Sequence, residues 1–226
     1  MKFTFDNRGA DSPLVETMWR TTSDAEGSFT STAIATWELV FTRSNGVMRA
    51  TLRGPETFSS PALVPADAEF IGIQFKLGTY MPTLPTHQFV DRAIELPARG
   101  GRRTFGFLGK VWDVPRFDNA DVFVGRLERA GLLRSDPVVR ASLAGHPPTV
   151  SLRTVQRRIL HVTGVTRRTL QLIERARRAA TQLEEGASIA DVVHGSGYSD
   201  QPHLTRSLRR FLGQTPGQIL REGAVG

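Results

Sequence analysis

The spacing of apolar residues changes along the chain, from a strand-like period of two to a helical period. β-branched and aromatic residues predict a strand over Ala33–Arg43. Asn45-Gly46 predicts a tight hairpin turn, and Val47–Arg53 reads as the returning strand. Glu69–Phe75 is a further predicted strand. Residues 1–98 are therefore expected to be mostly β, as a small barrel or sandwich.

From about Thr104 the pattern becomes helical, and we expect helices near 104–133. One of them, Asn119–Leu133, carries a predicted apolar stripe formed by Val122/Phe123, Leu127, Ala130 and Leu133. This stripe either packs against its own domain or forms a dimer contact, and the sequence leaves both alternatives open. Ser135-Asp-Pro137 marks the expected boundary between a domain of residues 1–136 and one of residues 137–226.

The second domain is predicted as a series of short helices with clear start and stop signals. The expected starts are Ser151, Thr166, Ser188, either Ser199 or Asp200, and Thr215-Pro216, and the expected stops include Gly164, Gly186 and Gly213. The predicted fold class is α+β. It consists of a β-rich, barrel-like or sandwich-like amino-terminal domain with trailing helices, followed by an all-α domain.

The charge is distributed unevenly between the two expected domains. The net charge is +7, yet residues 1–136 are neutral. Residues 137–226 hold 13 arginines against 6 acidic residues and carry the whole excess. Such asymmetry is typical of a neutral domain joined to one that binds a polyanion such as nucleic acid, although a solvated basic face has the same composition.

Several function classes are disfavoured by composition. The absence of cysteine excludes a disulfide scaffold, a thiolate metal site and a cysteine nucleophile. No apolar run is long enough to span a bilayer, so we expect a cytoplasmic protein without a membrane partner. Only His87 of the five histidines lies in the β region, and no catalytic constellation stands out by its spacing. We therefore expect no metal, no cofactor, no catalytic residues and no enzymatic activity.

Four aromatic residues in the β region have two interpretations: they line an apolar ligand pocket, or they are simply core. These residues are Trp37, Phe41, Phe70 and Phe75.

Residues Ser188–Leu212 have the layout of a helix-turn-helix motif, with a short apolar helix, a glycine-containing turn and a second helix. An upstream helix, Ser151–Thr163, has a buried stripe of Leu152, Val155, Ile159 and Val162 and a polar opposite face. The helix between them, of about 18 residues, would span about 27 Å, against about 34 Å for one turn of B-DNA. Two recognition helices, about 151–163 and 200–212, are thus expected to enter successive major grooves.

Residues 150–222 resemble the AraC-type DNA-binding domain of bacterial transcription regulators. The matching residues include Arg175-Ala176, Ile189-Ala190, Gly197–Gln201, His203–Arg206 and Phe211–Pro216. The resemblance implies that the DNA-facing residues are Arg153, Gln156, Arg157, Gln201, His203, Thr205, Arg206 and Arg209. The chain departs from a regular first motif at Pro147-Pro148, which must end the preceding helix, Val138–Ala144, early.

The amino-terminal region is more distantly similar to the small cupin-like sensor domains that precede this module in some regulators. The implied partners are double-stranded DNA, RNA polymerase, a small-molecule effector and a second copy of the chain bound through 119–133. The alternative is a non-regulatory β domain or an enzyme with a nonspecific basic tail that binds nucleic acid.

Overall fold

A computed structural model describes residues 5–99 and 103–223 and divides the chain into two compact units. The front unit comprises residues 1–28, 36–55 and 63–166. The rear unit comprises residues 29–35, 56–62 and 167–226. The compact units therefore do not follow the boundary expected at 136/137. Two short segments of the amino-terminal half belong to the rear unit, and the helices before residue 167 belong to the front unit.

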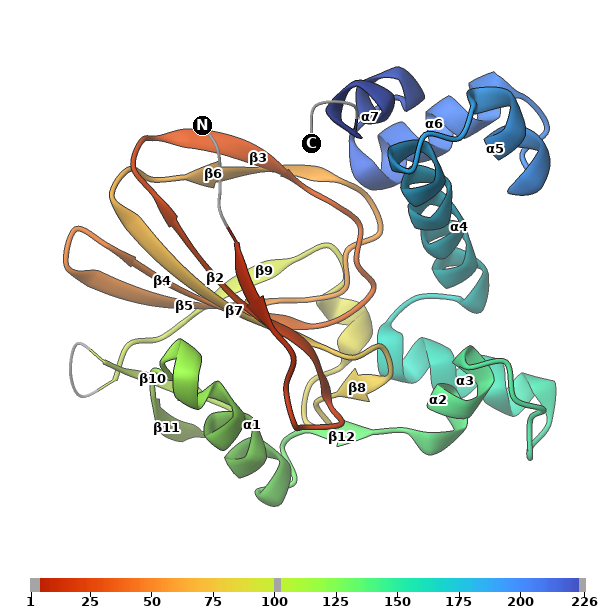
Figure 1. The fold of residues 1–226 in the computed structure, drawn as a ribbon. Coiled ribbons are helices and arrows are strands. Elements are labelled where there is room, and N and C mark those ends of the chain that lie inside the picture. The colour runs from red at the N-terminus through yellow and green to blue at the C-terminus, as the bar shows by residue number, and fades with distance from the viewer. Residues whose placement is uncertain (1–4, 100–102, 224–226) are drawn as a thin grey trace. The chain divides into compact units, whose positions relative to one another are not determined.

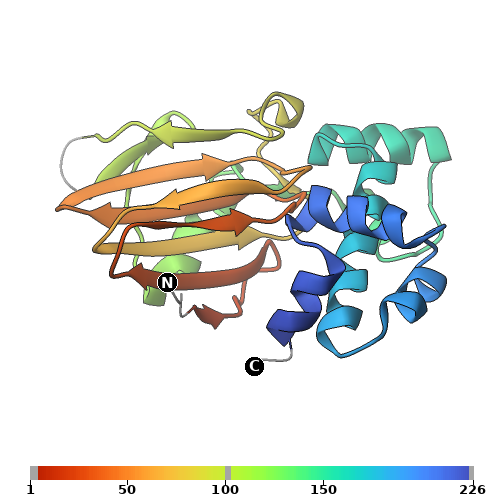
Figure 2. The same ribbon diagram turned by 90° about the horizontal axis from the view of Figure 1, so that it is seen from above.

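The front unit is built on a six-stranded antiparallel sheet (Figure 1; Figure 2 shows the same strands from above). In spatial order the strands are β1 (Asp6–Arg8), β2 (Val15–Ser23), β7 (Ala68–Phe75), β4 (Glu38–Ser44), β5 (Val47–Arg53) and β9 (Ala93–Leu96). The predicted hairpin turn between β4 and β5 is confirmed, because Asn45 and Gly46 have φ angles of 51° and 72°.

The strand predicted to begin at Ala33 begins only at Glu38. Ala33 lies in the rear unit, where its amide donates a hydrogen bond to the carbonyl of Phe211 instead of a neighbouring strand. The predicted strand was therefore too long at its start.

Residues 104–113 form a β-hairpin, so the helix expected from Thr104 is wrong over this stretch. Strands β10 (Thr104–Phe107) and β11 (Lys110–Asp113) pair antiparallel. The turn between them uses left-handed backbone at Leu108 (φ 51°) and Gly109 (φ 76°). Phe105 and Phe107 are both buried, which is the period of two that a strand requires.

Helix α1 (Ala120–Arg129) packs in the core of the front unit. Its buried residues are Ala120, Phe123, Val124 and Leu127. At the stripe position predicted as Val122/Phe123, Phe123 is buried and Val122 is 54% exposed; the stripe is wrong at Ala130, which is exposed and follows the end of the helix. Val124, which the predicted stripe did not include, is buried as well and belongs to the same core cluster.

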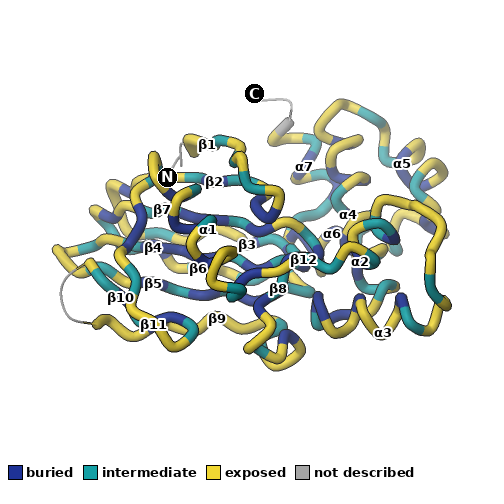
Figure 3. The backbone as a smooth tube through the Cα atoms, turned by 90° about the horizontal axis from the view of Figure 1, so that it is seen from below, coloured by how far each residue is buried: buried dark blue, intermediate teal, exposed yellow. Residues whose placement is uncertain are grey.

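The core of the front unit contains side chains from the sheet, the β10–β11 hairpin and α1 (Figure 3 shows the burial along the chain). Its remaining elements are β8 (Thr79–Tyr80), β12 (Arg134–Ser135), the 3-10 turns η1 (Thr86–Gln88) and η2 (Phe117–Asn119), α2 (Pro137–Leu143) and α3 (Leu152–Thr163). Strand β8 pairs with β12, and α3 packs on α2, β8 and η1.

The rear unit is a cluster of four helices. They are α4 (Arg167–Glu184), α5 (Ile189–Gly195), α6 (Gln201–Leu212) and α7 (Pro216–Gly223). Helix α4 contacts the other three through a face of leucine, isoleucine and alanine. The two amino-terminal segments of this unit contain most of β3 (Gly27–Ser31) and part of β6 (Ser60–Val64), which pair with each other. The predicted α+β fold class is confirmed.

Candidate nucleic-acid interface

The first helix pair, α2 and α3, is held by an aspartate at the start of α2. The Asp136 carboxylate accepts hydrogen bonds from the amides of Val138 and Val139, at 2.9 and 3.1 Å. Arg158 of α3 donates to the same carboxylate at 3.1 Å. One side chain thus caps α2 and ties it to α3. Helix α2 ends at Leu143, as the prolines at 147 and 148 require.

Helix α3 has the predicted limits. The Ser151 hydroxyl accepts from the Thr154 amide at 3.2 Å, and Gly164 ends the helix with φ 71°. Val155, Ile159 and Val162 are buried as expected. Leu152 is 62% exposed, so the predicted stripe is wrong at its first position, because the packing of α3 begins one turn later.

The outer face of α3 presents three of the predicted DNA-facing side chains. Arg153, Gln156 and Arg157 are all exposed. Within the described part of the chain their side chains make neither a hydrogen bond nor an ion pair. Arg158 lies beside them but is occupied by Asp136. Exposed, unpaired guanidinium and amide groups on one helix are suited to bind phosphates and base edges.

The turn between α5 and α6 is organised by Arg175, which projects from α4. Its guanidinium donates to the carbonyl of Gly197 at 3.2 Å and lies 4.3 Å from the ring centre of Tyr198. The Tyr198 hydroxyl is 3.1 Å from the hydroxyl of Ser207 on α6. This chain of contacts links the long helix, the turn and the recognition helix.

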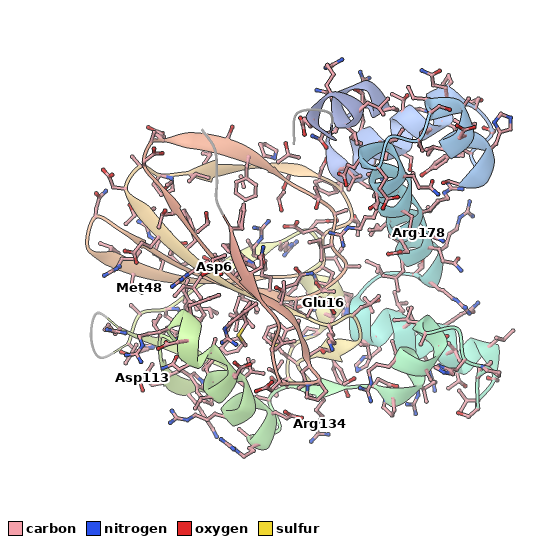
Figure 4. All side chains as sticks on the ribbon, in the orientation of Figure 1. Asp6, Glu16, Met48, Asp113, Arg134 and Arg178 are labelled. Atoms are coloured by element: carbon pink, nitrogen blue, oxygen red, sulfur yellow. The ribbon has the colours of Figure 1, made fainter. Side chains whose placement is uncertain are left out.

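The arginines of α4 differ in their surroundings. Arg178 is exposed and pairs with Glu174 at 3.7 Å (Figure 4 labels it), whereas Arg175 is half-buried against the turn. The structural role of Arg175 was missed. A tyrosine directly after the turn glycine was the available signal, since a buried tyrosine needs partners for its ring and hydroxyl.

Helix α6 is capped by Asp200, which resolves the choice between Ser199 and Asp200. The Asp200 carboxylate accepts from the His203 amide at 2.6 Å. Gly213 ends the helix with φ 74°. The predicted inward residues Leu204, Leu208, Phe211 and Leu212 are all buried.

The outward residues of α6 fall into two groups. Gln201, Arg206 and Arg209 are exposed, and in the described residues their side chains have no hydrogen-bond or ion-pair partner. Thr205 and His203 are half-buried. The His203 ring packs edge-on against Tyr198, and its Nδ1 is 3.1 Å from the Ser199 hydroxyl. One nitrogen of His203 is therefore engaged within the turn.

The four aromatic residues considered for a ligand pocket do not form one group. Trp37, Phe41 and Phe75 are at most 1% exposed and belong to the core cluster of the front unit. Phe70 is half-buried and lies outside that cluster. The structure therefore favours the core interpretation for the first three.

The described ranges, 5–99 and 103–223, contain no group of three or more histidine, aspartate or glutamate side chains arranged to hold a metal ion. They also contain no helix with the length and apolar character needed to cross a membrane.

Comparison with protein families assigns the helical region. A family model described as a helix-turn-helix domain matches residues 149–222. Residues 149–222 are an AraC-type helix-turn-helix domain. The AraC-type domain contains both candidate recognition helices, α3 and α6, and crosses the junction between the compact units at Thr166/Arg167. A DNA-binding module of transcription regulators is thereby established in about a third of the chain.

Solved structures give a weaker likeness. Apo ToxT carrying one substitution, from Vibrio cholerae, aligns with 9% identity over 95% of this chain and 99% of its own, with a TM-score of 0.43. Wild-type ToxT from Vibrio cholerae with a bound unsaturated fatty acid aligns with 9% identity over 94% and 97%, with a TM-score of 0.39. Scores below 0.5 do not establish a shared fold. A search of curated proteins gives no match.

Proposed function

We propose that the chain is a sequence-specific transcription regulator that reads DNA with α3 and α6. The observation that carries this proposal is the AraC-type domain, in which both helices present arginine and glutamine side chains that are exposed and have no partner among the described residues. The base-reading residues are Arg157 and Arg206, followed by Gln156 and Gln201. Arginine contacts guanine bidentately and glutamine contacts adenine, so these side chains can distinguish base pairs.

Two reading helices on one protomer allow binding to a site without palindromic symmetry. Helix α4, with 18 residues, measures about 27 Å at the standard rise and can separate two major-groove contacts by roughly one turn of DNA. The remaining DNA-facing residues, Arg153, His203, Thr205 and Arg209, then contact phosphates or flanking base edges.

The proposal extends to partners and location. As a regulator the chain acts in the cytoplasm, without catalysing a reaction, and contacts RNA polymerase on bound DNA. A homodimer through 119–133 has to use the outer face of α1, around Val122, because the inner face is buried in the front unit.

Selection of DNA from a random library, with full-length protein at near-physiological salt, tests this function. We expect one enriched motif with two parts about one helical turn apart. A single short half-site would restrict base reading to one helix. Equal recovery of all sequences with a steep salt dependence would contradict the proposal and support a nonspecific basic tail.

The front unit also offers an effector site. A cavity of about 370 Å³ lies between β5, β9 and the β10–β11 hairpin. Its lining includes the apolar Leu52, Leu84, Leu96, Phe107 and Val111 and the cationic Arg99 and Lys110. Gly106 leaves room for the Arg99 side chain, whose Cγ would lie 3.2 Å from a Cβ there. An apolar cavity edged by two cations suits a small amphiphile with one anionic head.

Decanoate is the probe for this site. We expect full-length protein to bind it measurably by calorimetry, and the R99E/K110E variant to lose at least tenfold in affinity, because two attractive charges become repulsive. The matched control R43E/K76E makes the same charge change at positions that do not line the cavity. Equal binding by both variants would rule out this cavity as the site.

A further inference from the structure

The carboxyl end of the recognition helix α6 is capped from outside the helical region. An α-helix leaves its last four carbonyl groups without partners inside the helix. In α6 the carbonyl of Arg210 accepts from the amide of Ser59 at 2.8 Å, and the carbonyl of Phe211 accepts from the amide of Ala33 at 2.7 Å. The Ser59 hydroxyl donates to the Arg209 carbonyl at 3.1 Å. Residues more than 140 positions away in sequence thus satisfy the carbonyls of Arg210 and Phe211 and add a second bond to that of Arg209, which also accepts from the Gly213 amide at 3.0 Å.

The donors come from the two amino-terminal segments of the rear unit, Phe29–Ala35 and Glu56–Ala62, which we call the capping ribbon. The ribbon is tied together internally. The Ser31 hydroxyl donates to the Glu56 carboxylate at 2.9 Å, and the Glu56 amide donates to the Ile34 carbonyl at 2.8 Å. The donors are therefore held in place by contacts of their own, and Ala33 is completely buried.

Both the end of α6 and its contact with the ribbon require glycine at position 213. Its φ of 74° already favours glycine at the position after the helix. In addition, a Cβ at Gly213 would lie 2.5 Å from Thr30 Cγ2 and 3.2 Å from the Ser59 hydroxyl. The helix end and the ribbon meet so closely that only a residue without a side chain fits.

We propose that the capping ribbon positions the recognition helix α6 and that Ser59 is its positioning residue. The inference rests on the proposed function and deepens it. Base contacts require side chains held to within about 0.5 Å and 10–20°, and a helix fixed at its carboxyl end by three donated bonds has less freedom to tilt. Ser59 acts through α6 and need not touch DNA itself.

The ribbon is continuous with the front unit along the chain. Strand β3 begins at Gly27 and β6 ends at Val64, and these outer residues belong to the front unit. The second reading helix therefore depends on residues that a fragment beginning at 137 would lack.

The first test compares S59A, S59T and S60A in the full-length chain, using the operator obtained by selection. Losing one hydrogen bond predicts about a twofold to tenfold lower affinity for S59A, with relaxed preference at the bases read by α6 and unchanged preference at those read by α3. S59T keeps the hydroxyl and is expected to restore the preference. S60A changes the next residue of the same segment and is the matched control. Wild-type preference in S59A would overturn the proposal, as would an equal loss in S60A.

The second test replaces Gly213 with alanine. A Cβ at this position would lie 2.5 Å from Thr30 Cγ2, so the ribbon or the end of α6 has to shift. We expect G213A to bind the operator more weakly than wild type, with relaxed preference at the bases read by α6. G186A is the matched control, because Gly186 also has a positive φ and a Cβ there would meet nothing within 4 Å. Wild-type preference in G213A, or an equal effect in G186A, would contradict a ribbon that positions α6.

The two proposals can fail separately. If neither wild type nor R206A distinguishes operator from random DNA, the proposed function is wrong. If R206A loses the preference and the Ser59 variants keep it, only the capping ribbon is wrong.

Discussion

Replacing Arg206 with alanine is expected to weaken binding to the selected operator by about 1–3 kcal/mol and to relax preference at one base pair. Arg206 is exposed in the middle of α6, on the face opposite the buried Leu204 and Leu208. Because its guanidinium has no partner in the described residues, binding DNA costs no existing ion pair. Competition binding against operators substituted at each position measures both effects.

Two variants separate base reading from simple charge. R206K keeps the charge but lacks the planar fork that matches guanine, so it is expected to recover little of the preference. R43A removes an exposed arginine from the front sheet, where it pairs with Glu69, and controls for the change in net charge. A uniform loss on every DNA sequence, rescued by lysine, would show that Arg206 contacts phosphate.

Local signals explain why the helical region was predictable. The side-chain oxygens of Ser151, Ser188 and Asp200 each accept a hydrogen bond from a backbone amide in the first turn of the helix that follows. Gly164 and Gly213 adopt the left-handed conformation that ends a helix. These are interactions between residues two to four positions apart, so the sequence contains both partners within one short window.

The rest of the site depends on contacts between residues far apart in the chain. No local pattern connects Ser59 with the end of α6, because the contact spans about 150 positions and its acceptors are backbone carbonyls, which every residue has. The β10–β11 hairpin was not predicted, for a different reason. The run from Thr104 to Trp112 is short and apolar, and such runs fit a helix or a strand until the left-handed Leu108 and Gly109 are known.

A second large effect is expected in the front unit, where the change from Phe41 to alanine should lower the free energy of unfolding by about 3–5 kcal/mol. Phe41 is 1% exposed and lies on β4. Its ring is 5.3 Å from that of Phe105 on the β10–β11 hairpin and 6.3 Å from that of Phe123 on α1. One side chain thus joins three elements, and removing it leaves a cavity that none of them can fill alone. Urea unfolding followed by tryptophan fluorescence measures the loss.

The same measurement decides between the two interpretations of Phe41. A residue that lines a ligand pocket can be shortened with little loss of stability, since the pocket is already open. A core residue cannot, because the neighbouring rings lose their contacts. Phe5, which is 46% exposed and touches Trp19 edge-on, provides the matched phenylalanine-to-alanine control, with an expected cost below about 1 kcal/mol. Similar small losses in both variants would show that Phe41 lines a ligand pocket. They would favour an effector site at the centre of the sheet over one in the hairpin cavity.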